Sequence, residues 1–337
     1  NPQSRCLNRL GQRVKIWRPR CLPTMPERPE VAVIGAGVVG LCTAIELLRT
    51  GARVSLFDRE PPARQTSFGN AAYLAAEYAE PLASLHNIRS AIALTFSRRS
   101  AFKVTADHLP GFVPWALRFA KAARPAQLQH NRIALRRLNT QVISAWQELL
   151  RFADASSMMS NSGFLKLWEQ AGYRQQALNM QATAEQAGFE TELIEGPALL
   201  EREPALSPGI QLALLYPGAQ QLCDPYRVCM KLFDCFQQHG GVFFQQPVYG
   251  LRPQQNQVEI QTDHQPRHFD QAIIAAGAWS NELLKSTGLS VPLAAERGYH
   301  LTLPDASLRP QHILESVERH VVLSSLDSGL RIVGYGE

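Results

Sequence analysis

The stretch that decides the fold is VAVIGAGVVGLCTAIELLRTGARVSLFDRE, residues 31–60. It opens with an apolar run at residues 31–34, which has the length and composition of a buried parallel strand. Residues 41–49 then carry apolar side chains at helical spacing, and residues 54–57 form a second apolar run that ends at Asp58. This order of strand, helix, strand and acid predicts a βαβ unit.

Three glycines, Gly35, Gly37 and Gly40, join the first strand to the helix in the pattern GxGxxG. The first permits a tight turn, the second lets the backbone approach a pyrophosphate, and the third lets helix and strand pack closely. The helix N-terminus offers free N–H groups and a partial positive charge to phosphates. Asp58 is placed to accept hydrogen bonds from ribose hydroxyls, which argues against the 2′-phosphate of NADP. Because all these parts follow in register, a dinucleotide site is favoured over an ordinary glycine turn.

The length and composition of the chain exclude several classes of protein. Its 337 residues indicate two domains, and its 45% hydrophobic and 19% charged residues are typical of a globular protein with a sizeable core. No apolar run approaches the roughly 20 residues of a membrane span. The six cysteines include no CxxC pair, so they fit thiols in a reducing, cytoplasmic compartment better than a disulfide framework. No metal site is predicted.

Charge is distributed unevenly along the chain. Residues 1–24 carry six basic residues and no acid, so the remainder has a net charge of −1 and gives no case for nucleic-acid binding. Residues 1–27 are therefore predicted to be a basic leader outside the fold. It has no apolar core, which excludes a secretory signal. A transit peptide stays open, but the position of Met25 just before the first strand favours sequence outside the functional protein.

Residues 85–152 are predicted to be helical. Bulky apolar residues mixed with basic ones run along 109–120, and apolar residues recur near helical spacing along 133–150. Basic helices of this kind can contact a membrane surface, whereas a solvated basic face on a packed helix is the commoner case. A peripheral contact with the inner membrane therefore stays open beside the cytoplasmic location.

The rest of the chain alternates strands and helices. Strands are predicted at residues 163–168, 210–216, 242–244, 248–251, 258–261, 269–276, 299–303, 321–324 and 330–333. Helices are predicted at residues 174–188, 224–236 and 281–285, with a connecting segment at 194–204. The opening βαβ unit is thus separated from the unit of residues 224–279 by a long block. Folds in which a parallel nucleotide sheet is interleaved with a separate substrate sheet have this order.

Four stretches carry a resemblance to a known family. They are VAVIGAGVVG followed by Asp58 and Arg59, TSFGNAAYL at residues 66–74, FDQAIIAAGAWS at residues 269–280, and the pair RGYHLTLP and GLRIVGYGE near the end. The second resembles a TSxxNAG segment and the third an AxGAWS strand end. Together they resemble FAD-dependent oxidoreductases of the D-amino acid oxidase superfamily, most closely the bacterial D-amino acid dehydrogenases. Together the four stretches span about residues 30–337, in the family's order.

The resemblance implies an α/β fold. An FAD-binding, Rossmann-like parallel sheet would be interleaved with an α+β substrate domain that contains a mostly antiparallel sheet. The FAD-binding domain would comprise residues 28–84 and 220–290, and the substrate domain residues 85–219 and 291–337. Family members continue past the last strand, so the resemblance also implies that the C-terminal part of the FAD domain is missing.

FAD is the cofactor that the resemblance implies. The residues expected to bind it are Gly35, Gly37, Val38, Val39, Gly40, Asp58, Arg59, Thr66, Ser67, Asn70, Ala71, Val248, Gly277, Ala278 and Trp279. Two residues depart from the family pattern. Ala72 stands where the family usually has glycine, which would crowd the cofactor. Ser325 stands where several relatives have an arginine that holds the substrate carboxylate, so the substrate class stays open.

The implied reaction is oxidation of a D-amino acid to an imino acid, with a hydride moving from Cα to flavin N5. Water then releases ammonia and a 2-oxo acid. A carboxylate that enters a low-dielectric site needs a cation. Arg297, Tyr299, His300 and Arg331 are the catalytic candidates, with Arg297 or Arg331 as the cation. Each is also explained as an ordinary residue on a half-exposed strand face.

Three alternatives remain from the sequence. The first is the same chemistry on glycine, sarcosine or a cyclic imino acid such as proline. The second is an NAD-dependent dehydrogenase, and the third is a non-catalytic, truncated flavoprotein. For the main prediction the partner is a small amino acid substrate, and the electron acceptor can be oxygen, a quinone or a carrier protein.

Overall fold

The computed structural model describes residues 28–77, 81–84, 88, 109–291, 293 and 295–336. The predicted leader, residues 1–27, lies outside these residues, as does nearly all of the helical stretch predicted over 85–108. The chain divides into two compact units built from alternating stretches of sequence. Unit 1 takes Asn1–Asn70, Pro225–Gly298 and Gly336–Glu337, and unit 2 takes Ala71–Asp224 and Tyr299–Tyr335. The boundaries thus follow residues 70, 224 and 298, where the sequence predicted 84, 219 and 290.

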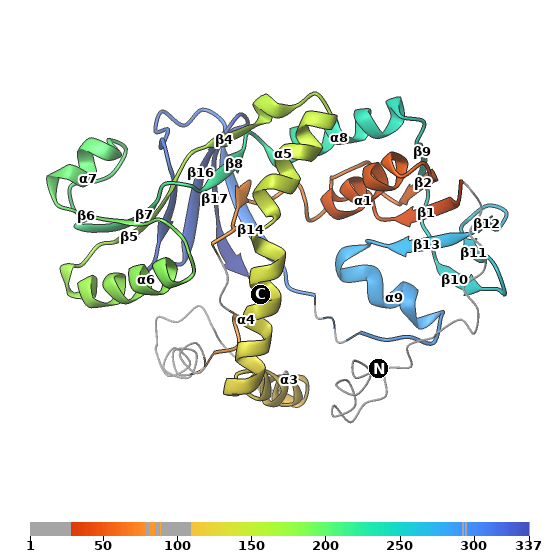
Figure 1. Cartoon of the computed structure of the whole chain (residues 1–337), viewed down its shortest axis with the longest axis horizontal. Coiled ribbons are helices and arrows are strands. Elements are labelled where there is room, and N and C mark those ends of the chain that lie inside the picture. The colour runs from red at the N-terminus through yellow and green to blue at the C-terminus, as the bar shows by residue number, and fades with distance from the viewer. Residues whose placement is uncertain are drawn as a thin grey trace. The chain divides into compact units, whose positions relative to one another are not determined.

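A four-stranded parallel sheet forms the centre of unit 1 (Figure 1). Its order is β13 (Gln271–Ile274), β1 (Glu30–Ile34), β2 (Arg53–Asp58) and β9 (Val242–Gln245). Val31 lies opposite both Val54 and Gln271 in the register. Residues 31–34 of β1 are buried because neighbouring strands and packed side chains surround this central strand. The apolar run predicted to be a buried parallel strand is confirmed.

Two helices pack side by side in unit 1, α1 (Val38–Arg49) and α8 (Pro225–Gln238). α1 connects β1 to β2 and buries Leu41 and Ile45, and α8 leads into β9. A short helix, α9 (Ser280–Lys285), follows β13. A small antiparallel sheet of β10 (Gly250–Pro253), β11 (Val258–Gln261) and β12 (Arg267–Phe269) contributes Leu251, Ile260 and Phe269 to the core of unit 1.

A seven-stranded sheet forms the centre of unit 2. Its order is β14 (Gly298–Leu303), β17 (Gly329–Gly336), β16 (Val321–Leu326), β15 (Ile313–Ser316), β5 (Phe164–Trp168), β7 (Leu212–Tyr216) and β6 (Glu192–Glu195). Only the β15–β5 pair is parallel among those whose direction the structure describes. A second, antiparallel sheet joins β3 (Tyr73–Leu74), β8 (Gln220–Leu222) and β4 (Met159–Asn161). The predicted fold class, a parallel sheet interleaved with a mostly antiparallel one, is confirmed.

Five α-helices of unit 2 lie among the described residues: α3 (Leu109–Ala122), α4 (Pro125–Asn139), α5 (Val142–Phe152), α6 (Arg174–Gln186) and α7 (Pro197–Arg202). α6 packs on β6 and β7, where Ala177 and Ala184 join the core around Phe164 and Trp168. The opposite core cluster, with Leu165 and Leu199, includes residues of α7. Short 3-10 turns occur at Ser156–Met158, Ala171–Tyr173 and Gly277–Trp279.

Among the described helices and strands, seven were not predicted: strands β3, β4, β6, β8, β12 and β15 and helix α7. Helix α7 lies in the stretch predicted to be a connecting segment. The acids and prolines of this stretch are typical of a loop, and the helix buries a single leucine, Leu199, so it shows no helical periodicity. Strand β12 has the sequence RHF, which carries no alternating apolar pattern. Strand β15 has the sequence ILES and is too short for a periodicity to stand out. Such short elements are held by tertiary pairing and packing, which local sequence patterns do not report.

Candidate functional site

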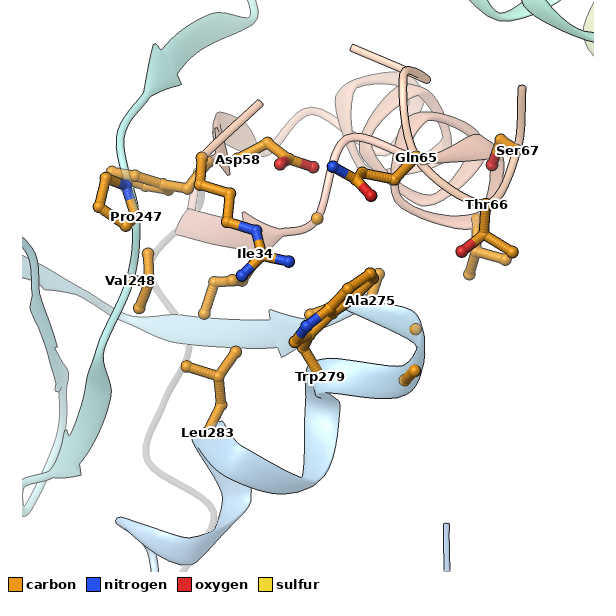
Figure 2. Close-up of a pocket in the computed structure, with 18 of the residues that line it drawn as sticks. Ile34, Asp58, Gln65, Thr66, Ser67, Pro247, Val248, Ala275, Trp279 and Leu283 are labelled. Atoms are coloured by element: carbon orange, nitrogen blue, oxygen red, sulfur yellow. The ribbon is translucent and has the colours of Figure 1, made fainter. Parts of the chain in front are cut away.

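A pocket of about 530 Å³ lies in unit 1, at the carboxyl ends of the four parallel strands (Figure 2). Ile34 of β1, Asp58 of β2, Pro247 and Val248 beyond β9, and Ala275 beyond β13 all line it. Ligands of open parallel sheets bind at this edge, and the volume is within the range of small-molecule sites.

Close contacts leave little or no room for a Cβ atom at the glycines of the turn after β1. Gly35 has φ +112°, and a Cβ atom there would lie 2.4 Å from the Ala275 carbonyl oxygen. A Cβ atom at Gly40 would lie 1.7 Å from the Gly35 carbonyl oxygen, so α1 approaches the turn only because position 40 is glycine. At Gly37 the nearest atom to a Cβ would be the Ser67 hydroxyl, at 3.1 Å. The turn is therefore kept free of side chains, as a pyrophosphate cradle requires.

Asp58 fixes this turn and still faces the pocket. Its Oδ2 atom accepts a hydrogen bond from the Ala36 N–H at 2.7 Å, and its Oδ1 atom accepts one from the Glu60 N–H at 3.0 Å. A carboxylate offers about four lone-pair positions, so acceptor capacity remains for hydroxyl groups of a ligand. Asp58 is partly exposed and lines the pocket, which fits the predicted role at a ribose.

The N-terminal residues of α1 and an arginine both line the pocket. The Val38 N–H donates to the Ser67 hydroxyl at 3.0 Å, and the first turn of α1 contains no acid. Arg64 lines the same pocket, with its guanidinium 4.5 Å from the centroid of the Tyr226 ring. A helix N-terminus and a positioned arginine together suit a diphosphate. No sequence pattern marked Arg64, because the contact that positions it, with the Tyr226 ring, joins two segments far apart in the chain.

The other end of the pocket is apolar and aromatic. Val248 and Leu283 lie along this wall together with Trp279 (Figure 2). The Arg59 guanidinium lies 4.4 Å from the centroid of the Trp279 ring. Such a wall accepts the flat face of a ring system, while the charged end of the pocket accepts phosphates.

Most of the predicted cofactor residues line this pocket. They are Gly35, Gly37, Val38, Val39, Asp58, Arg59, Thr66, Ser67, Val248, Gly277, Ala278 and Trp279. Gly40 does not line it and instead packs against the backbone of Gly35. Asn70 and Ala71 do not line it either; Asn70 is exposed and donates to the Ser67 carbonyl oxygen at 2.9 Å. Ala72 is buried in unit 2 with φ +61°, a conformation that explains why glycine suits this position.

The four catalytic candidates occupy different environments. Tyr299 and His300 are exposed on β14, and Arg297 is exposed just before that strand. Arg331 on β17 is 2% exposed and pairs in register with Ser324. Partial burial and the nearby Arg331 charge lower the pKa of His300, which favours its neutral form. The structure therefore brings His300 and Arg331 together on adjacent strands of unit 2.

The charge of Arg331 is offset by a buried acid. Burial lowers the pKa of Arg331, and the charge of Asp224 opposes that shift. Asp224 is itself 3% exposed and accepts a hydrogen bond from the Ser328 hydroxyl at 2.5 Å. Because a carboxylate already lies near this cation, the arrangement supports a structural role for Arg331 inside unit 2.

A different arginine lies beside Ser325. The Ser325 hydroxyl donates to the Pro310 carbonyl oxygen at 2.7 Å. The neighbouring Arg309 donates to the carbonyl oxygens of Leu326, at 3.0 Å, and Pro304, at 3.2 Å. Arg309 is exposed, and no carboxylate among the described residues lies within ion-pair distance of it. No sequence pattern marked Arg309, because it belongs to a loop without a motif.

Unit 2 also contains a buried polar cluster on its large sheet. Lys166 of β5 and Glu315 of β15 form an ion pair at 2.6 Å. The Tyr73 hydroxyl donates to Glu77, and burial raises the pKa of Glu77 to about 7 despite the opposing charge of Lys166. Burial, with the charges of Glu77 and Glu315, raises the pKa of Tyr216 to about 12. No group of His, Cys, Asp and Glu in the described part of the chain is arranged to hold a metal ion.

The chain matches a known family over residues 30–337, and that family is described as "FAD dependent oxidoreductase". The chain belongs to the FAD-dependent oxidoreductase family. FAD is therefore its cofactor, and the NAD-dependent alternative is excluded. The side-chain-free turn, the carboxylate and the cationic helix end fit the dinucleotide part of FAD.

Relatives of this FAD-dependent oxidoreductase include amino acid oxidases and dehydrogenases. The D-amino-acid oxidase of Bradyrhizobium diazoefficiens is 27% identical over 92% of this chain and 74% of that protein. The D-amino acid dehydrogenase of Dechloromonas aromatica is 29% identical over 91% of this chain and 76% of that protein. The chain thus spans about three quarters of the length of these relatives.

Solved structures share the fold. Glycine oxidase from Geobacillus kaustophilus superposes with a TM-score of 0.66 at 16% identity, covering 93% of this chain and 72% of that one. L-proline dehydrogenase from P. horikoshii superposes with a TM-score of 0.63 at 16% identity, covering 93% and 71%. These similarities establish the fold alone.

None of the helices in the described ranges combines the length and hydrophobicity needed to cross a membrane.

Proposed function

We propose that this oxidoreductase oxidises the carbon–nitrogen bond of an amino acid, and that a D-amino acid is the substrate. The observation that carries the proposal is a dinucleotide pocket in a chain whose sequence relatives are named D-amino acid oxidase and D-amino acid dehydrogenase. The products are an imino acid and, after hydrolysis, a 2-oxo acid and ammonia. Glycine, sarcosine and cyclic imino acids are the competing substrates, since glycine oxidase and proline dehydrogenase share the fold.

The proposed roles of the pocket residues follow from their chemistry. Asp58 accepts hydrogen bonds from the ribose, while the N-terminus of α1 and Arg64 hold the pyrophosphate. Val248 and Trp279 cover the apolar part of the ligand. When bound, FAD supplies a two-electron acceptor for hydride. The residues of this chain bind it, exclude water and orient the substrate.

The substrate carboxylate requires a cation that is not already neutralised. Arg297 and Arg331 are the cations proposed from the sequence, and the structure adds Arg309 to them. Arg309 is the strongest of the three, because its hydrogen bonds go to neutral carbonyl oxygens and leave its charge available. Arg331 is the weakest, because Asp224 faces it. Tyr299 supplies a hydroxyl group from β14, the strand next to β17.

A substrate panel tests the reaction. Purified protein reconstituted with FAD is supplied with D- and L-amino acids, glycine, sarcosine and proline, and the 2-oxo acid and ammonia are measured. We expect product with D-amino acids. Product from proline or sarcosine alone would replace the D-amino acid assignment, and hydrogen peroxide formation would distinguish oxygen from a quinone or carrier as the acceptor.

A panel of arginine variants tests the anchor. Replacing the true anchor with methionine should raise the half-saturating amino acid concentration by about two orders of magnitude, which corresponds to about 2–3 kcal/mol for a charge-assisted pair. We expect this for Arg309→Met, with partial rescue by Arg309→Lys and unchanged FAD content. Arg319→Met is the matched control, because Arg319 is exposed and pairs with Glu169. An unchanged half-saturating concentration in Arg309→Met would move the anchor to Arg297 or Arg331.

A further inference from the structure

Helices α3 and α4 carry large apolar side chains that the described part of the chain leaves uncovered. On α3, Trp115 is 46% exposed and Leu117 is 68% exposed. On α4, Ile133 is 45% exposed and Leu138 is 70% exposed. Exposed leucines occur singly on ordinary surfaces, but a group on two adjoining helices indicates an interaction site. We call residues 113–139 of these two helices the α3–α4 surface (Figure 1).

On α4, and among the described side chains of α3, no residue is buried, unlike the core-facing side of an ordinary surface helix. α4 has 15 residues and none is buried. On α3 the Trp115 and Phe119 rings stack on each other, with centroids 4.9 Å apart, while Val113 and Leu117 follow each other at four-residue spacing on one face. A helix that faces the interior normally buries a stripe of its apolar residues. The apolar residues of α3 and α4 therefore point to an occupant outside the described chain.

The same surface is strongly basic. Residues 109–139 contain no Asp or Glu and six basic residues: Arg118, Lys121, Arg124, Arg132, Arg136 and Arg137. The rest of the chain after residue 24 has a net charge of −7, so positive charge is concentrated on these two helices. Pairing with a second copy of the same surface would bring like charges together, since Arg118, Lys121, Arg124 and Arg137 are all exposed. The occupant must therefore carry negative charge and also offer an apolar phase.

We propose that the α3–α4 surface docks on an anionic lipid bilayer. Helices with Trp and Leu beside Lys and Arg lie in the interface of such a membrane, with the apolar side chains inserted and the cations at the headgroups. Tryptophan favours this depth because its ring is apolar and its N–H is polar. Long arginine and lysine side chains reach the headgroups while their stems cover apolar surface.

Sedimentation with lipid vesicles tests the proposal on the full chain with FAD bound. Vesicles of phosphatidylcholine alone are compared with vesicles that also contain phosphatidylglycerol. We expect binding to the anionic vesicles, little binding to the neutral ones, and release as the salt concentration rises. Equal binding to both kinds of vesicle, or to neither, would overturn the proposal.

Variants on exposed positions separate the two contributions. Arg124→Gln and Arg137→Gln should each reduce partitioning onto anionic vesicles about fivefold, because one headgroup contact is lost. Leu117→Ser with Leu138→Ser should weaken binding without changing its salt dependence. Arg174→Gln and Leu308→Ser are the matched controls, since both residues are exposed elsewhere in unit 2. Variants that bind like these controls would contradict the assignment. Saturable binding of polyglutamate with no vesicle binding would assign the surface to an acidic protein instead.

Discussion

Asp58 combines two tasks in one carboxylate, since it holds the glycine turn and faces the pocket. Asp58→Asn keeps the size of the side chain and removes its charge. We expect FAD affinity to fall about ten- to a hundredfold, which corresponds to about 1.5–3 kcal/mol for a charge-assisted hydrogen bond. FAD occupancy on dilution measures the loss.

Asp270→Asn is the matched control for this variant. Asp270 also accepts a hydrogen bond from a backbone N–H, that of Glu30 at 2.8 Å, but it does not line the pocket. The control should lower stability and leave FAD affinity unchanged. If both variants hold FAD as tightly as the unmodified chain, Asp58 has no role at the ribose.

Glu77 should make the stability of the protein depend on pH near neutrality. Burial raises its pKa from 4.5 to about 7, so between these values the folded chain binds a proton that the unfolded chain has released. Stability should therefore fall as the pH rises through this range. Glu77→Gln should flatten the profile, because the amide does not titrate and can still accept from Tyr73. Urea midpoints from pH 5 to 8 measure this, and identical slopes in the two proteins would rule out the raised pKa.

At the scale of elements, the contact between α1 and the turn after β1 depends on Gly40. Gly40→Ala would place a Cβ atom against the Gly35 carbonyl oxygen and force the helix away from the sheet. Overpacking of this kind costs about 1–3 kcal/mol, and more where backbone must shift. We expect a lower melting temperature and a lower FAD content. Gly218→Ala, at a turn with no atom within 4 Å, should change neither.

Glu203, just after α7, forms hydrogen bonds with the residues that precede β15. It is fully buried and accepts from the N–H groups of Gln311 and His312 and from the His312 ring at 2.9 Å. Burial alone would raise the pKa of Glu203, but these hydrogen bonds lower it below its ordinary value. Its stabilisation is therefore complete above the ordinary carboxyl pKa and is lost as the pH falls through the lowered one.

Glu203→Gln should reduce the free energy of unfolding at pH 7 by about 1–3 kcal/mol, because buried donors lose a charged acceptor. Its unfolding should also become less sensitive to acid. Glu192→Gln is the control, since Glu192 pairs with Arg202 at 3.4 Å on the surface and such pairs contribute about 0–1 kcal/mol. If both variants lose the same free energy of unfolding, the buried hydrogen bonds of Glu203 contribute no more than a surface ion pair.

The elements predicted from sequence are those whose signals are local. The β1–α1–β2 unit has apolar periodicity, three glycines and a terminal acid within 30 residues, so the fold class and much of the pocket followed from it. Arg64 could not be found in this way, because the distant Tyr226 positions it, and Arg309 could not, because it lies in a loop without a motif. The offset of Arg331 by Asp224 joins residues more than a hundred positions apart, so no local sequence pattern could show it.

At the scale of the whole molecule, the central claim is that FAD held by this chain accepts hydride from an amino acid. The most direct measurement is the visible spectrum of the FAD-bound protein, titrated without oxygen with D-amino acids and then with their L-isomers. The account predicts that a D-amino acid bleaches the oxidised flavin absorption stoichiometrically and that its L-isomer does so weakly or not at all. A flavin that stays oxidised with every amino acid, yet is reduced by dithionite, would contradict it.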